Sequence, residues 1–115
     1  MIEYEKFKFI DMVYIASKRT TKIDLKQFVS RKVLNIWEYD KANDTNYFST
    51  LSTYVSCNCS IINTSAKMFV HKNTVSYRID RIEEIFKLDL SDEEVLFSTF
   101  YSCEIMKYYQ EIKKQ

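Results

Sequence analysis

The stretch SAKMFVHKNTVSYRIDRIEEI, residues 65–85, decides the fold. It starts with small and apolar residues, passes through a short break at residues 70–72 and continues into a segment with apolar residues at helical spacing. On a helical wheel the apolar side of this segment consists of Val75, Ile79, Ile82 and Phe86. The opposite side consists of Asn73, Tyr77, Asp80 and Glu84. The stretch therefore predicts two helices joined by a tight turn.

The composition of the 115-residue chain extends this prediction to the whole fold. The chain has no glycine and no proline, whereas average usage would give about 8 glycines and about 6 prolines. Hairpins and tight β-turns depend on these two residues, so their absence argues against β and α/β folds. Apolar residues make up 46% of the chain, which is enough to build a core. We predict an all-α fold whose helices are capped by Ser, Thr, Asp and Asn.

The apolar periodicity predicts six helices. They are expected at 3–18, 24–39, 47–56, about 60–69, about 72–87 and 92–113. Ser60 or Asn58 is expected to cap the fourth helix, and a Ser91-x-x-Glu94 capping box is expected to start the last one. The polar segment at 39–46 is the expected boundary between a helical linker and possible dimerisation segment, residues 1–45, and a second domain, residues 46–115. The first and last helices each carry two apolar stripes, which indicates that a partner subunit covers one of them.

Charge and cysteine content give weaker information about function. The net charge of +1 says little about a nucleic-acid partner. Locally, however, basic residues predominate at 67–81, and all the charged residues at 89–104 are acidic. Three cysteines, an odd number, and a start unlike a signal peptide favour the cytoplasm. No apolar run reaches the roughly 20 residues that a transmembrane helix needs, so no membrane partner is expected.

A helix, a short turn and a second steeply crossing helix form a helix-turn-helix, whose second helix enters the major groove of DNA. Asn73 can bind an adenine edge, Lys72 a phosphate or a guanine edge, and Tyr77 a thymine methyl group or a phosphate. Arg78 and Arg81 are expected along the phosphate backbone. The predicted DNA-binding residues are His71, Lys72, Asn73, Thr74, Ser76, Tyr77, Arg78 and Arg81.

The segment FVHKNTVSYRIDRIEEIFKLDLSD, residues 69–92, resembles a known family of helix-turn-helix domains. It is similar to the C-terminal region of the purine-catabolism and sugar-diacid regulators (PucR-type), a family of bacterial transcription factors. The family pattern L-x-V-H-x-N-T-x-x-Y-R-L is matched at Met68, Val70, His71, Asn73, Thr74, Tyr77, Arg78 and Ile79. The following I-E-x-L-x-x-L-D-L pattern is matched at Ile82, Glu83, Phe86, Leu88, Asp89 and Leu90. Upstream, LSTYV at 51–55 and FVSRKVLNIWEYD at 28–40 resemble the preceding helix and the segment that leads to it.

The resemblance implies sequence-specific binding of double-stranded DNA by a dimeric bacterial transcriptional regulator. Family members carry sensory domains in front of this region, so we expect the chain to be the C-terminal part of a longer protein. The chain departs from the family at Ser65, where alanine is usual, at Ser76, where a basic residue is common, and at Asp80, which adds a negative charge.

Other interpretations stay open at this point. His71 can be a structural turn residue or a helix cap, Tyr77 can pack on a neighbouring helix, and Arg78 can pair with the acidic last helix. Cys57 and Cys59 favour a helix end over a metal or redox site, and Cys103 is expected in the core. No cofactor is expected and an enzyme is the weakest option, because nothing supplies a pocket for paired carboxylates. The alternative function is a helical protein–protein module that does not bind DNA.

Overall fold

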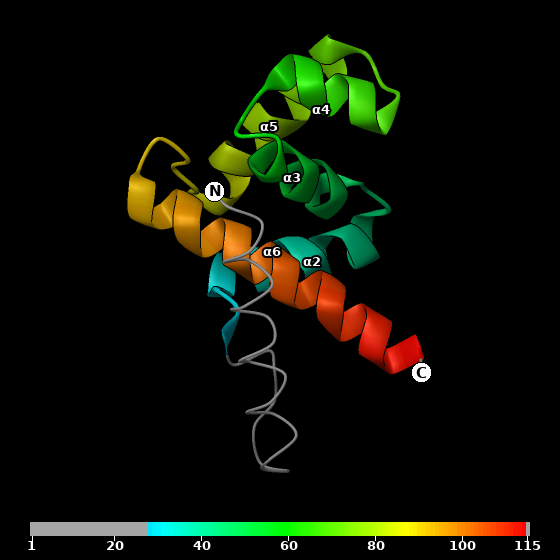
Figure 1. The fold of residues 1–115 in the computed structure, drawn as a ribbon, viewed down its shortest axis with the longest axis vertical. Helices are drawn as coiled ribbons and strands as arrows, with labels where there is room; N and C mark the ends of the chain where they lie inside the picture. Colours follow the sequence, from blue (N-terminus) through cyan, green and yellow to red (C-terminus); the bar gives the residue numbers. More distant parts are fainter. Residues whose placement is uncertain (1–27, 115) are drawn as a thin grey trace.

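The computed structural model describes residues 28–114, and in this part of the chain all regular structure is helical (Figure 1). The helices are α2 (Arg31–Asn43), α3 (Tyr47–Ser56), α4 (Ile61–Met68), α5 (Lys72–Phe86) and α6 (Glu93–Lys114). The all-α prediction is confirmed. The expected helix at 3–18 and the beginning of the one at 24–39 lie outside the described residues.

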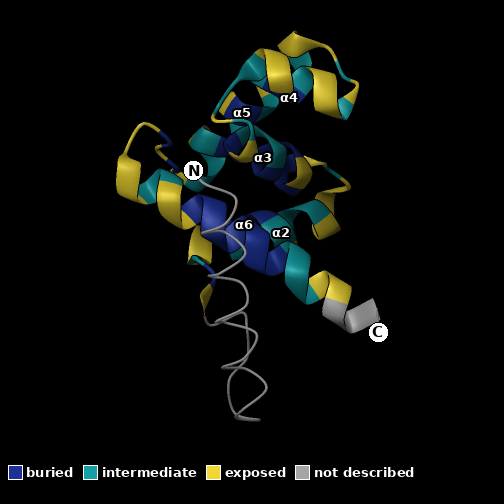
Figure 2. Cartoon of the chain, viewed as in Figure 1, coloured by how far each residue is buried: buried dark blue, intermediate teal, exposed yellow. Residues whose placement is uncertain are grey.

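Helix α3 is the centre of the arrangement. It contacts all four of the other described helices, with α4 and α5 at one end of the molecule and α2 and α6 at the other (Figure 1). The most deeply buried apolar side chains come from α2, α3, α5 and α6: Val33, Ile36, Leu51, Val75, Ile82, Ile105 and Met106. Figure 2 shows this buried material running along α3 and the middle of α6. The predicted inward residues of α3, namely Phe48, Leu51 and Val55, are buried as expected.

The first N–H groups of a helix have no carbonyl partner within the helix, and here side chains accept hydrogen bonds from some of them. The hydroxyl of Ser30 accepts a hydrogen bond from the N–H of Val33 at 3.2 Å, and that of Ser60 accepts one from Asn63 at 3.1 Å. The cap expected at Ser60 is therefore confirmed. The predicted bounds of α3 are also confirmed, and α4 and α5 end within one residue of their predicted ends.

The capping box predicted at Ser91 is wrong. The carboxylate of Asp92 accepts hydrogen bonds from the N–H groups of Glu94 at 2.9 Å and Val95 at 3.3 Å. Ser91 instead donates its hydroxyl to Asp89 at 2.6 Å, and its N–H to the same oxygen at 3.1 Å. Asp89 thus closes a local turn that takes Ser91 away from the helix, and the neighbouring carboxylate becomes the cap.

The predicted limits of α2 are also wrong at both described ends. Residues 28–30 are not α-helical, because Ser30 has an extended backbone and acts as the N-cap. At the other end, residues 39–43 belong to the helix although they were expected to form a polar break. They stay helical because Tyr39 stacks on Tyr47 of α3 (5.6 Å between ring centroids) and packs edge-on against Phe86 of α5 (5.4 Å).

The absence of glycine forces ordinary residues into the left-handed backbone region where helices end. Asp44, Phe69 and Lys87 end α2, α4 and α5 with φ of 53°, 58° and 54°. The turn between α3 and α4 contains two more such residues, Asn58 and Cys59. Each side chain in this region costs about 1–2 kcal/mol relative to glycine. Phe69 recovers little of this cost from packing, because 93% of it is exposed.

The start of α3 is capped from a distance by Asp40 of α2. Asn46, which precedes α3, makes no side-chain cap. The two carboxylate oxygens of Asp40 accept hydrogen bonds from the N–H groups of Tyr47 at 3.0 Å and Phe48 at 2.8 Å, and from the hydroxyl of Thr45. A negative charge at a helix N-terminus is also favourable to the helix dipole. Asp40 therefore fixes both the first residue of α3 and the angle at which α2 meets it.

We predict that Asp40→Ala lowers the free energy of unfolding by about 1–3 kcal/mol, because two backbone donors lose their partner. Urea denaturation followed by circular dichroism measures this change. Glu38→Ala, an exposed acidic position on the same helix, is the matched control and should stay within about 0.5 kcal/mol of wild type. Equal effects of the two substitutions would contradict the capping role.

We predict that Phe69→Gly raises the free energy of unfolding by about 0.5 kcal/mol. Relief of the left-handed strain exceeds the extra chain entropy that glycine gives the unfolded state. Ala66→Gly, at an exposed position within the same helix, should instead lower it by about 1 kcal/mol. Thermal and urea melts of the two variants measure both changes, and a loss of stability in Phe69→Gly would show that its side chain makes a stabilising contact.

Candidate DNA interface

Helices α4 and α5 and the turn between them form the predicted helix-turn-helix. The turn consists of Phe69, Val70 and His71, and it is held by the hydroxyl of Ser65, which donates to the carbonyl of Val70 at 2.5 Å. The N–H of Val70 bonds back to the carbonyl of Ser65 at 3.3 Å. Thr64, one residue earlier, is fully buried. The hydroxyl that Ser65 has in place of the family's alanine thus binds within the turn.

The two faces of α5 are as predicted. Val75, Ile79 and Ile82 are buried in the core and Phe86 is half-buried. The polar side, Asn73, Tyr77, Asp80 and Glu84, is exposed. Tyr77 is 62% exposed, so the interpretation in which it packs on a neighbouring helix does not hold within the described chain. Ser76 and Thr74 lie half-buried on the edges of this surface.

The N-terminus of α5 is open to an anionic partner. The imidazole of His71 is the N-cap and accepts a hydrogen bond from the N–H of Asn73 at 3.0 Å, so the capping interpretation of this residue is confirmed. His71, Lys72 and Asn73 are all exposed. The first turn of α5 has no acidic residue, and the sequence has none from residue 45 to residue 79. No carboxylate close to it in the sequence therefore compensates the positive end of the helix dipole.

The two arginines of α5 are half-buried, and they have different partners. Arg78 is half-buried, and its Nη1 donates to the hydroxyl of Thr50 at 3.3 Å. Arg81 forms an ion pair with Glu84 at 3.5 Å. A hydrogen bond to Tyr47 raises the pKa of Arg81 above its ordinary value, and Glu84 acts in the same direction. Arg78 thus has a partner on α3, and not on the acidic last helix considered from the sequence.

Sequence reasoning missed the residues that support this face. Thr50 on α3 is fully buried and holds Arg78, while Glu83 on α5 accepts the N–H of Leu90 at 3.3 Å. Glu83 thereby fixes the Leu88–Leu90 segment, whose two leucines are buried. The sequence did contain a signal for one of these roles, because Glu83 stands at a position of the family pattern.

The cysteines do not form a recognisable metal centre. Cys57 and Cys59 are half-buried in the turn after α3, and Cys103 is buried in α6, as expected. Within residues 28–111, no group of three or more metal-binding side chains comes together. Burial raises the pKa of the Cys103 thiol to about 12. Burial also raises the pKa of Cys59, although its hydrogen bond with Tyr54 acts in the opposite direction.

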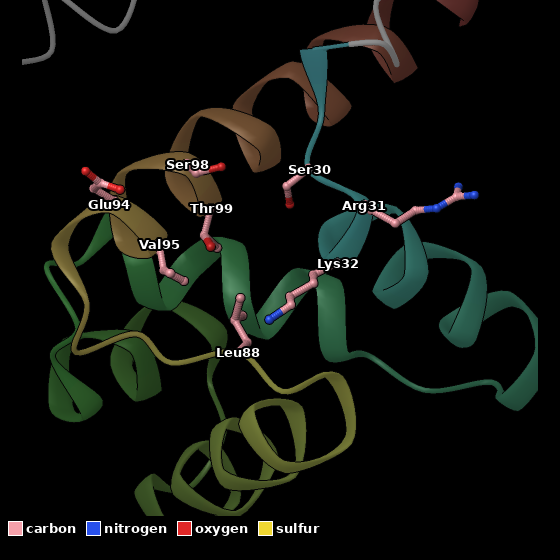
Figure 3. Close-up of a pocket in the computed structure, with 8 residues that line it drawn as sticks. All are labelled: Ser30, Arg31, Lys32, Leu88, Glu94, Val95, Ser98 and Thr99. Carbon is pink, nitrogen blue, oxygen red and sulfur yellow. The ribbon is translucent and has the colours of Figure 1, made fainter.

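A hollow of about 320 Å³ lies away from this face, between the start of α2 and the start of α6 (Figure 3). Figure 3 shows Lys32, Leu88, Val95 and Thr99 turned toward it, while Arg31 and Glu94 point away. The ammonium group of Lys32 is bonded to the carbonyl of Lys87. Most of the surface of its wall is apolar, and Lys32 is the one charged lining residue that turns toward it.

Comparison with known proteins agrees with this geometry. Residues 47–105, just over half of the chain, match the family described as the PucR C-terminal helix-turn-helix domain. The chain belongs to this family. The resemblance inferred from residues 69–92 is therefore confirmed, and the match takes in α3, α4, α5 and the first half of α6.

Several curated bacterial proteins are similar to this PucR-type chain. The purine catabolism regulatory protein of Bacillus subtilis is 35% identical over 71 residues, which cover 62% of this chain and 13% of that protein. The proline-responsive transcriptional activator PutR of the same organism is 32% identical over 68 residues, covering 59% of this chain and 16% of its own length. The DNA-binding transcriptional activator AdeR is 29% identical over 69 residues. The chain thus spans less than a fifth of each of these relatives, all of which are named as regulators.

No solved structure matches the chain. Among the described helices, none is both long enough and apolar enough to cross a membrane.

We predict that iodoacetamide modifies the three thiols of the folded protein in the order Cys57, Cys59, Cys103. The pKa of Cys59 is raised, which lowers its thiolate fraction, and the pKa of Cys103 is higher still in a site without access. Timed quenching at pH 8.5 and peptide mass spectrometry measure the three rates. In denaturant the rates should converge, and native labelling of Cys103 as fast as that of Cys57 would contradict the burial of α6.

Proposed function

We propose that this chain binds double-stranded DNA as the DNA-binding unit of a bacterial transcriptional regulator, with α5 in the major groove. The observation that supports this most strongly is the exposed polar face of α5, which opens at an uncompensated helix N-terminus in a helix-turn-helix of the PucR family. This surface has no packing role in the described chain. At the N-terminal end of this surface, His71, Lys72, Asn73 and Tyr77 are residue types that read base edges or bind phosphate.

The residues at the N-terminal end of the face each suit a particular contact. The amide of Asn73 can make two hydrogen bonds to an adenine edge, and Lys72 can bind a guanine edge or a phosphate. The ring of Tyr77 can pack on a thymine methyl group while its hydroxyl binds a phosphate. His71 can donate to a phosphate through the ring nitrogen that does not cap α5. Thr74 and Ser76, on the edges, are placed to add shorter contacts.

We further propose that the unit works as a homodimer within a longer protein. Two copies related by two-fold symmetry would place their α5 helices in successive major grooves, about 34 Å apart, on an inverted repeat. The chain matches 13% and 16% of two of its relatives, which supports a larger regulator with additional domains that sense a signal. A regulator that acts on a bacterial chromosome would work in the cytoplasm.

A protein–protein module is the second candidate function. It is favoured by two exposed apolar side chains on α4 and its C-cap, Ile62 (73% exposed) and Phe69 (93%). Ile62 lies in the first turn of α4 and Phe69 directly after its last residue. Salt separates the two functions: DNA binding weakens by orders of magnitude between low and moderate salt, whereas an apolar protein interface hardly changes.

The direct test is selection from a pool of randomised duplex DNA at low salt, followed by sequencing of the bound fraction. Enrichment of an inverted repeat would support a dimeric reader of DNA sequence. Enrichment of a single half-site would support DNA reading by a monomer and contradict the dimer. Absence of binding at every salt concentration would contradict the proposed function and favour the protein–protein module.

We predict that Tyr77→Ala and Asn73→Ala each weaken binding of the selected duplex by about 1–3 kcal/mol, because each removes a base or phosphate contact. Fluorescence anisotropy titrations measure the affinities, and circular dichroism checks that the variants fold. Asn35→Ala, at an exposed position on α2, is the matched control for Asn73→Ala and should bind like wild type. If both α5 variants also bind like wild type, α5 is not the helix in the groove.

A further inference from the structure

Contacts from two other helices converge on the first turn of α3, which consists of Asn46, Tyr47, Phe48 and Thr50 and is called here the α3 start. From α5, Arg78 donates to the hydroxyl of Thr50 at 3.3 Å. That hydroxyl is fully buried and donates in turn to the carbonyl of Asn46 at 2.8 Å. The guanidinium group of Arg78 is thus connected through Thr50 to the residue at which α3 begins.

The α3 start is itself immobilised from the side of α2. The carboxylate of Asp40 holds the N–H groups of Tyr47 and Phe48, and the ring of Tyr39 stacks on that of Tyr47. Tyr39 also packs edge-on against Phe86, so α2 contacts α5 near the C-terminal end of α5. The place where Arg78 binds is therefore a fixed point, defined by α2 and α3 together.

We infer that Arg78 is a positioning residue for DNA reading: it ties α5 to the α3 start and sets the angle at which α5 presents its exposed face. This assignment rests on the proposed function, and it gives Arg78 a different role from the phosphate contact expected from the sequence. Tyr77, the preceding residue, points outward and is exposed, whereas Arg78 is half-buried against α3. A planar guanidinium group is suited to such a task, because its donors have a fixed direction.

Arg81 contributes to the same attachment one turn further along α5. It is paired with Glu84 at 3.5 Å, and Tyr47 of the α3 start acts to raise the pKa of its guanidinium group. Both arginines of α5 have partners within the protein, and Lys72 and His71 are the exposed basic side chains at the N-terminal end of this helix. Phosphate binding by the face would then depend on these two residues and on the helix N-terminus.

The test compares Arg78→Gln, Thr50→Val and the double variant in binding to the duplex selected by wild type and to a scrambled duplex of equal length. Thr50→Val is almost isosteric and removes the acceptor without changing the charge of the protein. The carbonyl of Asn46 keeps its backbone hydrogen bond from Thr50, at 3.1 Å. Affinities are measured over a range of salt concentrations, because a lost phosphate contact reduces the slope of log K against log salt by about 0.9.

We expect each single variant to weaken binding of the selected duplex by about 2- to 30-fold, with little change for the scrambled duplex. The salt slope should stay that of wild type, and the double variant should bind no more weakly than the weaker single variant. A merely structural defect would lower the affinity for both duplexes alike, so the ratio of the two affinities distinguishes positioning from folding.

The inference is overturned if Arg78→Gln lowers the slope of log K against log salt by about 0.9 while Thr50→Val binds like wild type. Arg78 would then contact a phosphate. It is also overturned if the two substitutions act additively. If Thr50→Val does not fold, the slope of log K against log salt for Arg78→Gln alone distinguishes a positioning role from a phosphate contact. Failure of the proposed function is seen separately, because wild type would then show no preference for any duplex.

Discussion

The hydrogen bonds from the N–H groups of Tyr47 and Phe48 to the carboxylate of Asp40 are the interaction on which the rest of the structure depends. Helix α3 touches every other described helix, so the residue at which it starts and the direction in which it runs determine where the others pack. In a chain without glycine or proline, Asp44 ends α2 in the left-handed backbone region, and Asn46 at the N-cap position of α3 supplies no capping hydrogen bond. A carboxylate supplied by the preceding helix does this instead.

Helix α2 therefore contributes to the structure of the helix-turn-helix unit, although the family match begins only at residue 47. Tyr39 and Asp40 lie before the matched region, yet one stacks on Tyr47 and the other caps α3. A displacement of α2 would therefore move the α3 start, to which Arg78 of α5 is attached. Such a connection is a physical means by which a domain ahead of α2 could influence the angle of α5.

Much of the helix-turn-helix could be predicted from the sequence, because its signals are local. The spacing of Val75, Ile79 and Ile82 gave the buried face of α5, and Ser60 gave the start of α4. The limits of α2 and the cap of α6 could not be predicted, since both depend on competition between alternatives. The sequence of residues 39–43 resembles a polar break, and the Tyr39 contact that keeps this segment helical is with a residue far along the chain. Asp89 accepts the hydroxyl hydrogen bond of Ser91, so Asp92 and not Ser91 caps α6. The partner of Arg78 is 28 residues away along the chain and has no signal in the local pattern.

We propose that the exposed face of α5, beginning at His71, is the surface that contacts DNA. Nuclear magnetic resonance of the labelled protein, titrated with the duplex that it selects, locates the contact surface residue by residue. We expect the largest shifts and the intermolecular contacts on the side chains of Lys72, Asn73, Ser76 and Tyr77, with Arg78 remaining in contact with Thr50. Shifts centred on Ile62 and Phe69, or on α6, with α5 unchanged, would contradict it.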